Sequence, residues 1–377
     1  MFKPYRICIF AGVDYATNVH LDSLHIAWML QKEYPDGLEI DLLSTHGPNY
    51  DSQDNNLNFV HYNSIKSEEV PARIPTKAVL EQRCLNKYME HNEPNIILQI
   101  THETRTGLML SIATKRFDVP FIYRYSGDSF NAFSVAEGWR KFGYFGFHNI
   151  IGRLPLKFAA RHIVFGPRGR RRLLNRGVPA DNIAVLPPAI DITKFNTKQQ
   201  PPNTDAEATF DEDRFSILFV GRPTRRKGFH FLLSHVSEIT SIVGDVEFVF
   251  VGIDETDNPA ILADEYANRT RFIGQVPPKH MPYYFQCADL LVQPSYLEGL
   301  PRIILEALAS GTPVVAREVG EVGAVTDNTF TTTSEFLDLV RNYDDLTTDP
   351  VDDYDRRVLS PKYSAFFDRL CRAYSSG

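Results

Sequence analysis

The sequence predicts an α/β protein made of two doubly wound, Rossmann-like domains that face each other across a cleft. Short apolar segments rich in β-branched residues alternate with segments of helical periodicity, as expected when helices cover both faces of a parallel sheet. The alternation is interrupted once, by a proline-rich and acidic stretch over 199–213, and then resumes. The interruption divides the chain into two domains of ordinary size.

Seven segments before the interruption are short, apolar and rich in β-branched residues, which is typical of buried strands. They are 6–11, 38–44, 58–62, 95–100, 120–125, 161–165 and 182–186. Helical periodicity fills the gaps between them, for example over 21–33 and 77–90. We therefore expect a first doubly wound domain over residues 1–198.

Five further strand segments follow the interruption, at 215–220, 247–251, 271–273, 289–292 and 313–316. They predict a second domain over 214–355, with 199–213 as the linker. Apolar residues at helical spacing over 361–374 predict a closing helix, within 356–377, that packs back on the first domain. The acidic run 345–355 is expected to be a solvated connection.

Composition argues against several classes of function. The chain has 377 residues, 43% of them hydrophobic, and a formal net charge of −7, which disfavours nucleic-acid binding. The four cysteines have neither disulfide-framework nor metal-ligand spacing, so we expect a reducing, cytoplasmic location. The apolar runs are far shorter than the roughly 20 residues that cross a bilayer. The run that begins at Ile7 is interpreted as the first strand rather than as a signal peptide.

The segment from Glu298 to Glu306, Glu-Gly-Leu-Pro-Arg-Ile-Ile-Leu-Glu, is the most informative about function. Pro301 suits the first turn of a helix, and the apolar run after it reaches Gly311, a natural helix stop. Glu298 then lies just outside the helix and Glu306 inside it, on the order of 10 Å apart. Two carboxylates at this separation can each bind the hydroxyls of one sugar of a nucleotide sugar.

Spacing alone leaves other roles open for these glutamates. Glu306 follows Arg302 at i,i+4 spacing, which is typical of a solvated surface pair. Carboxylates about 5 to 10 Å apart also serve as the acid and base of glycoside hydrolases. A ligand site is favoured because the preceding segment, 288–295, reads as a buried strand ending in a loop, where open parallel sheets bind ligands.

A second motif, Phe219-Val-Gly-Arg-Pro-Thr-Arg-Arg-Lys-Gly228, joins a strand to a helix through a basic loop. Its four cations and the free N–H groups of a helix start suit an anion such as a diphosphate. A solvated basic turn is the alternative. Glycine on both sides of the loop allows the backbone to approach a ligand closely and favours the phosphate interpretation.

With these two motifs and Val185-Leu-Pro-Pro-Ala-Ile-Asp191…Phe195, the chain resembles a family-four retaining glycosyltransferase of the GT-B fold. The three motifs occur in the family's order over nearly the whole chain. The resemblance implies a nucleotide-sugar donor whose diphosphate is held by Arg222 and Lys227, with the base near 274–276, at Val276. It also implies that Glu298, Gly299 and Leu300 bind the donor sugar and that Glu306 binds the ribose.

The resemblance assigns less to the first domain. The loop after the first strand, with Gly12, resembles the family's glycine loop at the phosphates and the acceptor, but has one glycine where many relatives have two. His102 follows the strand 95–100 and is a candidate catalytic residue, although a structural hydrogen bonder fits as well. Asp128 stands where relatives often carry a histidine, and either an acceptor-side catalytic role or a turn role suits it.

The implied reaction is transfer of the sugar to a hydroxyl acceptor with retention at the anomeric carbon. Because Arg222 and Lys227 neutralise the leaving diphosphate, we expect no metal or other cofactor. The letters Asp211-Glu-Asp213 match a metal-binding pair, but their place in the linker favours a solvated acidic run. No side chain stands out as a covalent nucleophile, so departure and attack on one face is our working hypothesis.

Two segments bear on the acceptor, which we expect to be a glycan, a lipid-linked glycan or a small molecule. The first is aromatic and consists of Phe130, Phe133, Trp139, Phe142, Tyr144, Phe145 and Phe147. It suits a sugar or a lipid chain, but core or interdomain packing is favoured slightly. The second is basic and consists of Arg168, Arg170, Arg171, Arg172 and Arg176. A solvated face is the commoner role of such a patch, and peripheral contact with an anionic membrane is the alternative.

Three rival functions share part of this pattern. A nucleotide-sugar epimerase of the same architecture would convert the donor without an acceptor. A two-domain sugar-binding protein would bind free sugar and ignore nucleotides. A nicotinamide dehydrogenase is disfavoured because neither domain has Gly-x-Gly-x-x-Gly after its first strand. The sequence identifies neither the donor's base and sugar, nor the acceptor, nor the oligomeric state.

Overall fold

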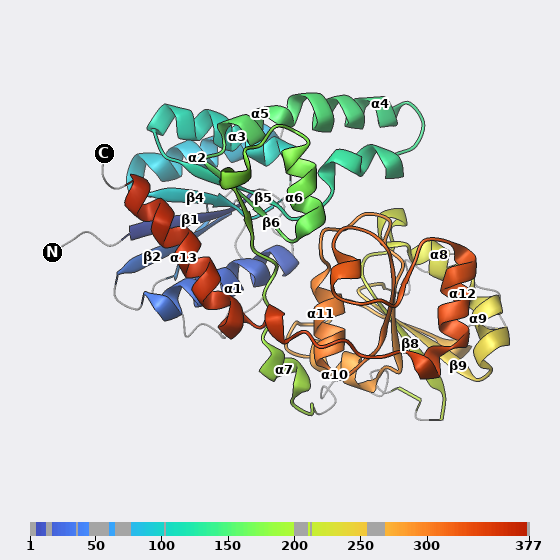
Figure 1. The fold of residues 1–377 in the computed structure, drawn as a ribbon. Coiled ribbons are helices and arrows are strands. Elements are labelled where there is room, and N and C mark those ends of the chain that lie inside the picture. Colours follow the sequence, from blue (N-terminus) through green and yellow to red (C-terminus); the bar gives the residue numbers. More distant parts are fainter. Residues whose placement is uncertain are drawn as a thin grey trace. The chain divides into compact units, whose positions relative to one another are not determined.

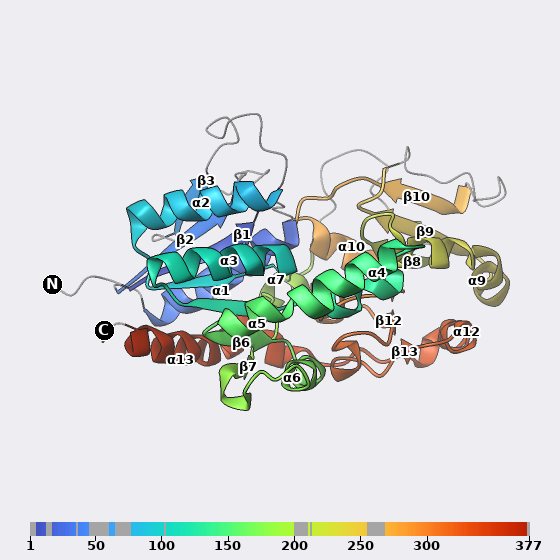
Figure 2. The same cartoon turned by 90° about the horizontal axis from the view of Figure 1, so that it is seen from above.

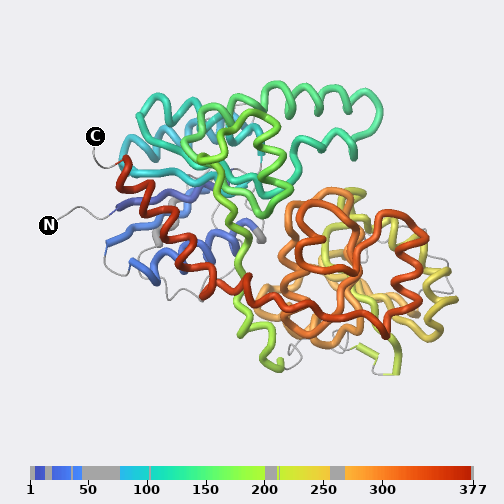
Figure 3. Tube along the Cα trace, viewed as in Figure 1, coloured from blue at the N-terminus to red at the C-terminus, as the bar shows by residue number. Residues whose placement is uncertain are grey.

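A computed structural model describes residues 5–12, 17–34, 37–44, 60–64, 77–101, 103–199, 210–211, 213–254 and 268–374. The chain folds into two compact units, whose course is traced in Figures 1 and 3. The first comprises residues 1–189 and 356–377, and the second comprises residues 190–355. Among the described helices, none combines the length and the apolar character needed to cross a bilayer.

The first unit contains a parallel sheet with the order β3-β2-β1-β4-β5-β6-β7. Its strands are β1 Tyr5–Gly12, β2 Leu38–Ser44, β3 Val60–Ser64, β4 Ile96–Gln99, β5 Phe121–Tyr125, β6 Arg161–Val164 and β7 Ile183–Val185. Its helices are α1 Thr17–Glu33, α2 Lys77–Asn92, α3 Thr104–Phe117, α4 Arg140–Phe145, α5 Arg153–Phe158, α6 Pro167–Leu174 and α13 Arg356–Tyr374. The strands predicted from the apolar segments are confirmed.

Alternate residues of β1 supply two separate cores, one on each face of this sheet. Ile7 and Ile9 pack with α1 and α13, whereas Cys8 and Phe10 pack with α2 and α3. Figure 2 shows α2 and α3 on one side of the strands and α13 on the other. The period of two in a strand therefore explains why these segments are apolar at most positions on both faces.

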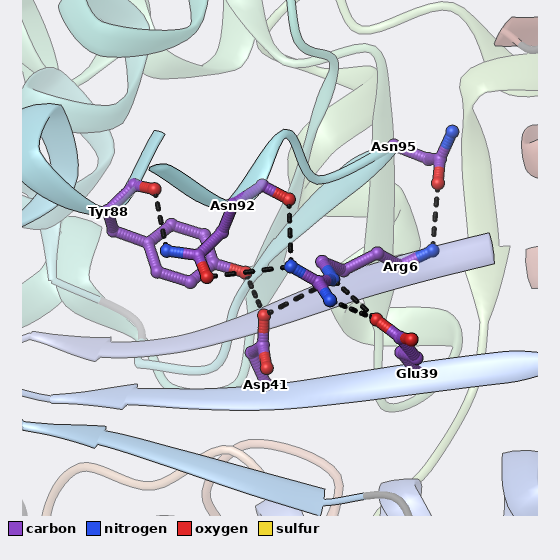
Figure 4. A network of polar contacts seen from close by, with 6 residues as sticks. All are labelled: Arg6, Glu39, Asp41, Tyr88, Asn92 and Asn95. Atoms are coloured by element: carbon purple, nitrogen blue, oxygen red, sulfur yellow. Dashed lines mark hydrogen bonds and ion pairs between the residues drawn. The ribbon is translucent and has the colours of Figure 1, made fainter. Parts of the chain in front are cut away.

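A polar network ties the start of β1 to its neighbours (Figure 4). Arg6 pairs with Glu39 of β2, and its Nη1 donates to the carbonyl of Asn92 at 3.0 Å. Asp41 of β2 accepts a hydrogen bond from the hydroxyl of Tyr88 in α2. Since Asp41 is buried, this bond satisfies a carboxylate that would otherwise be costly to remove from water.

The second unit contains a parallel sheet with the order β10-β9-β8-β11-β12-β13. Its strands are β8 Phe215–Val220, β9 Val246–Val251, β10 Thr270–Ile273, β11 Leu290–Gln293, β12 Val314–Arg317 and β13 Thr329–Phe330. Its helices are α7 Ile192–Asn196, α8 Phe229–Leu233, α9 Val236–Val243, α10 Met281–Cys287, α11 Arg302–Ala309 and α12 Thr333–Arg341. Helices α8, α9 and α12 cover one face, and α10 and α11 pack on the other (Figure 1).

The chain passes between the units at 189/190, not within 199–213 as predicted. Ile190 donates its backbone N–H to the carbonyl of Tyr354 at 3.0 Å, and the ring of Phe195 lies 6.1 Å from that of Phe285 in α10. These contacts place α7 in the second unit. The predicted solvated connection 345–355 also ends differently, because Asp355 is buried and accepts the N–H of Ile192.

The closing helix α13 lies against α1 in the first unit. The hydroxyl of Ser360 donates to the carbonyl of Met29 at 2.8 Å, and that of Tyr363 donates to the carbonyl of Pro187 at 2.8 Å. The helix therefore covers the sheet face that α1 leaves open and fixes the chain just before it enters the second unit.

A buried ion pair makes a testable contribution to the first unit. Arg124 of β5 is 2% exposed, pairs with Asp22 of α1 at 2.9 Å and donates to the carbonyl of Ile100 at 3.1 Å. We expect Arg124→Ala to lower the free energy of unfolding of this unit by about 3 to 5 kcal/mol, because it removes a buried guanidinium that both the Asp22 carboxylate and the Ile100 carbonyl contact. Arg341→Ala, which breaks the exposed pair with Asp338, should cost about 0.5 kcal/mol or less. Urea denaturation of both variants measures the difference, and equal losses would contradict it.

Candidate functional site

The strand order of the second sheet places two loops side by side. Counted from β8, the order is 3-2-1-4-5-6, so the direction of winding reverses between β8 and β11. Ligands of open α/β sheets bind outside the carboxyl ends of the strands at such a switch point. The loops that leave it are the basic loop 221–228 and the loop 294–301, which are the two motifs that the sequence singles out.

The basic loop turns sharply and touches its neighbour. A single turn, Arg225–Lys227, is capped by Thr224, whose Oγ1 accepts the Lys227 N–H. Gly228 follows with φ +75°, and a Cβ there would lie 2.2 Å from the carbonyl oxygen of Pro294. Glycine is therefore required, because any side chain would push the two loops apart.

Two cations of this loop converge on Glu298. Lys227 Nζ donates to Glu298 Oε1 at 2.7 Å, and Arg226 Nη2 lies 4.0 Å from Oε2. Arg226 Nε also donates to the carbonyl of Leu297 at 3.1 Å. Burial by itself raises the pKa of Glu298, but the attraction of Lys227 and Arg226 outweighs it, so the net pKa lies below its ordinary value. The carboxylate is thus ionised at neutral pH.

A third loop, after β12, packs against the backbone of Glu298 and Gly299. Gly320 has φ +58°, and a Cβ there would lie 2.0 Å from the carbonyl oxygen of Gly299. The N–H of Glu321 donates to the same carbonyl at 2.7 Å. Leu300 is buried beside them. Three loops therefore fix the backbone on which the predicted sugar-binding residues lie.

Glu306 lies inside α11, as predicted. Its ion pair with Arg302 is largely buried and is not the solvated surface pair that the spacing also allowed. Arg302 Nη2 donates to Glu306 Oε1 at 2.9 Å, and both side chains are about 10% exposed or less. The helix begins one residue later than expected, since Pro301 has φ −70° and ψ 123° and serves as the N-cap. An extended N-cap still suits proline, because it needs no N–H donor there.

The remaining second-unit candidates lie on the neighbouring loops. Arg222 is exposed in the basic loop, and Val276 is half-buried in the loop after β10. The N–H of Gly252 donates to the carbonyls of Ile273 and Gly274 at 2.9 and 3.0 Å, which fixes the start of that loop. Asp211, from the suspected metal-binding letters, pairs with Arg214 at 3.3 Å. No cluster of three metal-ligating side chains occurs in the part of the chain that the structure describes.

Gly12 ends β1 at the switch point of the first sheet, where the order reverses between β1 and β4. Its φ is +74°, and a Cβ there would lie 3.0 Å from Glu81 Oε1. Glu81 is fully buried in α2 and accepts hydrogen bonds from Thr106 and Arg105 at 3.1 and 3.0 Å. His102, the candidate that follows β4, lies outside the described residues.

Asp128 follows β5 and its carboxylate is fully engaged. Tyr125 donates to Oδ1 at 2.7 Å, Asn131 donates to Oδ2 at 2.5 Å, and Arg172 of α6 pairs with Oδ2. Asp128 is 6% exposed. Asp128 therefore links β5, the turn at 129–135 and α6, and these contacts are typical of a structural carboxylate.

Residues 214–346 match the family model described as "Glycosyl transferases group 1". The family likeness lies within the second unit, which contains both motifs. The D-inositol 3-phosphate glycosyltransferase of Arthrobacter sp. (strain FB24) is 32% identical over 149 residues of the chain. That match covers 37% of this chain, which spans about a third (35%) of the relative's length.

Solved structures extend the likeness from residues 214–346 to the whole fold. HepE of Anabaena in complex with UDP-glucose has a TM-score of 0.65 at 15% identity, with 98% of each chain covered. A UDP-GlcNAc 2-epimerase from Methanocaldococcus jannaschii has a TM-score of 0.60 at 12% identity, covering 97% of this chain and 99% of its own. The fold is GT-B, as the sequence motifs predicted.

Sequence reasoning missed three parts of the arrangement. Arg226 was seen in the basic loop but received no role, although it is the second cation near Glu298. The support by Gly320 was missed, and a glycine after the predicted strand 313–316 was the available signal. Glu81 was missed because a carboxylate inside a helical pattern reads as solvated unless its burial is known.

The Gly228 contact predicts a steric effect that can be separated from backbone strain. Gly228→Ala should cost about 2 kcal/mol or more, since alanine meets both a left-handed φ and the Pro294 carbonyl. Gly311→Ala is the matched control, because Gly311 has φ +85° and nothing within 4 Å of its Cβ position. It should lose only about 1 kcal/mol. Thermal unfolding of both compares them, and equal losses would show that the loops do not touch.

The lowered pKa of Glu298 predicts a pH-dependent stability difference. Its favourable contribution is fully present above the unfolded-state value of about 4.5 and is lost as the pH falls through the lower folded-state pKa. Glu298→Gln should therefore be less stable than the wild type at pH 7, and the gap should narrow below about pH 4.5. Urea denaturation at pH 7, 5 and 4 measures this gap. A gap that stays constant to pH 4 would argue against the Lys227 pair.

Proposed function

We propose that the protein is a retaining glycosyltransferase that moves a sugar from a nucleoside-diphosphate sugar to a hydroxyl acceptor. The observation that carries this proposal is the Lys227–Glu298 pair at the switch point of the unit that matches the group 1 glycosyltransferase model. A site of two cations and one buried carboxylate offers an anion-binding group and a hydroxyl-binding group within one hydrogen bond of each other.

The donor diphosphate would bind at the basic loop. The Lys227 ammonium has three donor hydrogens, and its bond to Glu298 uses one of them. Arg226 is held by Leu297 and Glu298, whereas Arg222 and Arg225 are exposed. Of these two, the family motif favours Arg222 as the arginine that binds the diphosphate. The adenine, guanine or pyrimidine base would contact the loop at Val276. HepE, which shares the fold, binds UDP-glucose and supports a donor of this class.

Each of the two glutamates would bind one of the two sugars of the donor. Ionised Glu298 would accept hydrogen bonds from hydroxyls of the transferred sugar, and the backbone N–H groups of Gly299 and Leu300 would donate to its oxygens. Glu306, held by Arg302 but with a second carboxylate oxygen to offer, would accept the ribose hydroxyls. Binding at both ends fixes the anomeric carbon relative to the diphosphate, which lowers the entropic part of the barrier.

Lys227 and Arg222 would stabilise the charge on the departing diphosphate without a metal ion. We propose that the acceptor attacks on the face that the diphosphate leaves, which gives retention. Gly12 would lie at the acceptor side, and Asp128 would position α6 rather than transfer a proton, because three partners hold its carboxylate. The four cysteines lack the spacing of a disulfide framework, which is consistent with the cytoplasmic location that we propose.

A nucleotide-sugar epimerase is the second candidate, because an enzyme of that activity shares the fold. Incubation of the protein with UDP-, GDP- and ADP-sugars, with and without a panel of hydroxyl acceptors, separates the two. Transfer requires an acceptor and releases the nucleoside diphosphate, whereas epimerisation needs none. NMR of the product anomer tests retention, and activity in excess EDTA tests metal independence. Turnover without acceptor that yields an epimer would overturn the proposal.

The ribose role predicts a binding defect. Glu306→Ala should raise the KM for the donor about 10- to 100-fold with little change in kcat, because it removes a charge-assisted hydrogen bond that substrate and transition state share. Glu306→Gln keeps an acceptor for Arg302 and controls for folding. Glu238→Ala, an exposed glutamate of α9, should leave KM unchanged. Steady-state kinetics measures all three, and an unchanged KM in Glu306→Ala would remove the ribose role.

A further inference from the structure

The segment from Gly138 to Ala180 has a charge pattern unlike the rest of the chain. It contains ten lysines and arginines and no aspartate or glutamate, whereas the whole chain carries a net charge of −7. The basic residues are Arg140, Lys141, Arg153, Lys157, Arg161, Arg168, Arg170, Arg171, Arg172 and Arg176. Only the last five stand out as a basic patch from the sequence alone. The positive field of this segment therefore comes from two places, α6 and the helices before it.

Those preceding helices expose large apolar side chains. Helix α4, a π-helical turn over Gly146–Ile151 and α5 follow one another directly and are here called the arm, Trp139–Phe158. Trp139 and Phe142 are each 82% exposed, and Ile150 is 67% exposed. The sequence slightly favoured core or interdomain packing for its seven aromatic residues here. The core part of that prediction is wrong, because among these seven residues only Phe130 is buried.

The apolar side chains of the arm extend onto α3. Ile150, Leu154 and Phe158 recur at i+4 spacing and are all exposed. Leu154 and Phe158 line a groove of about 490 Å³ together with Leu108 and Ile112 of α3, and Lys115 and Arg116 stand at the same groove. Figure 2 shows α5 beside α3. The exposed apolar surface is thus continuous over two helices and is flanked by cations.

The arm is fixed to the first unit rather than loosely attached. Asn149 Nδ2 donates to the carbonyl of Phe130 at 2.9 Å, and its Oδ1 accepts from Arg176 Nη2 at 3.2 Å. The Arg176 guanidinium lies 3.7 Å from the Phe130 ring centroid. Thr104, the first residue of α3, hydrogen-bonds to His148 Nδ1 at 2.9 Å. An exposed apolar face that is held at its middle in this way needs little rearrangement to bind a flat partner.

We propose that the arm is the surface by which the protein binds to an anionic lipid bilayer. Trp139, Phe142 and Ile150 would enter the boundary between headgroups and acyl chains, and Arg140, Lys141, Arg153 and Lys157 would pair with lipid phosphates. Amphipathic helices with aromatic residues on one face and cations around them bind membranes in this way. Each cation near an anionic surface adds to the attraction, which salt weakens.

Charge selects the lipid over a second copy of the chain as the partner. Two arms brought together would oppose each other with four cations apiece and no acidic residue, so they would repel. An anionic bilayer instead complements that charge and covers the apolar side chains at once. The acidic remainder of the chain is repelled by the same bilayer, so the arm would be the part that faces it.

Sedimentation with vesicles tests the proposal. The protein should co-sediment with vesicles of phosphatidylcholine containing phosphatidylglycerol and bind at least about tenfold more weakly to phosphatidylcholine alone or in 0.5 M NaCl. Trp139→Ala combined with Phe142→Ala should weaken binding at least about tenfold, and Arg140→Glu with Lys141→Glu similarly. Val358→Ala with Tyr374→Ala, two exposed apolar residues of α13, is the matched control and should bind as the wild type.

Fluorescence reports on the arm directly, because the chain has two tryptophans, Trp28 and Trp139. In Trp28→Phe, the emission should shift to the blue on addition of the anionic vesicles and should be quenched by brominated acyl chains. Absence of binding to anionic vesicles, equal binding to neutral ones, or wild-type binding by the Trp139 and Phe142 double variant would each overturn the proposal. So would a dimer in solution that this double variant dissociates and that does not bind vesicles.

Discussion

The contact between the loops after β8 and β11 is the constraint on which the candidate site depends. Gly228 has to be a glycine because the Pro294 carbonyl occupies the place of a Cβ, and this approach sets Lys227 and Glu298 2.7 Å apart. The pairing makes the carboxylate an acceptor at neutral pH and leaves the ammonium with donors for a ligand. The loop after β12 meets the same backbone through Gly320. A site made of three loops is thereby as rigid as the strands that carry them, which suits the binding of a long and flexible donor.

Much of the fold follows from the strand segments alone, because strands buried on both faces are apolar at nearly every position and can be recognised one at a time. The segment 38–44, for instance, coincides with β2. Strand β13 has two residues, too few for any periodicity to show. The sequence placed Lys227 and Glu298 in two motifs at strand ends but did not predict that they touch. Their contact depends on the 3-2-1-4-5-6 strand order of the sheet, which no local pattern encodes. The burial of Glu306 and Arg302 is likewise a property of the packed helix and not of their spacing.

The arm shows the converse limit of sequence reasoning. Aromatic residues favour cores, so a segment with Trp139 and Phe142 was taken for packing, yet both are almost fully exposed. The π-helical turn after these two residues adds a second departure from a regular helical pattern. One extra residue per turn rotates the face of the following helix, and Gly152 allows it because a Cβ there would lie 2.1 Å from the carbonyl oxygen of His148. Such a register change is invisible to any fixed period of 3.6. The boundary between the units at 189/190 was not predicted for a similar reason. It depends on the packing of α7 against α10, which is a tertiary contact that no local sequence pattern shows.

The two switch points differ in how their charged side chains pair. Next to Gly12 in the first sheet, Arg105 pairs with both Glu81 and Glu103. Next to the β8 loop in the second sheet, Lys227 and Arg226 both lie near the carboxylate of Glu298. In the proposed function, the second cluster is the one that would stabilise the leaving diphosphate, because it brings two cations to one place.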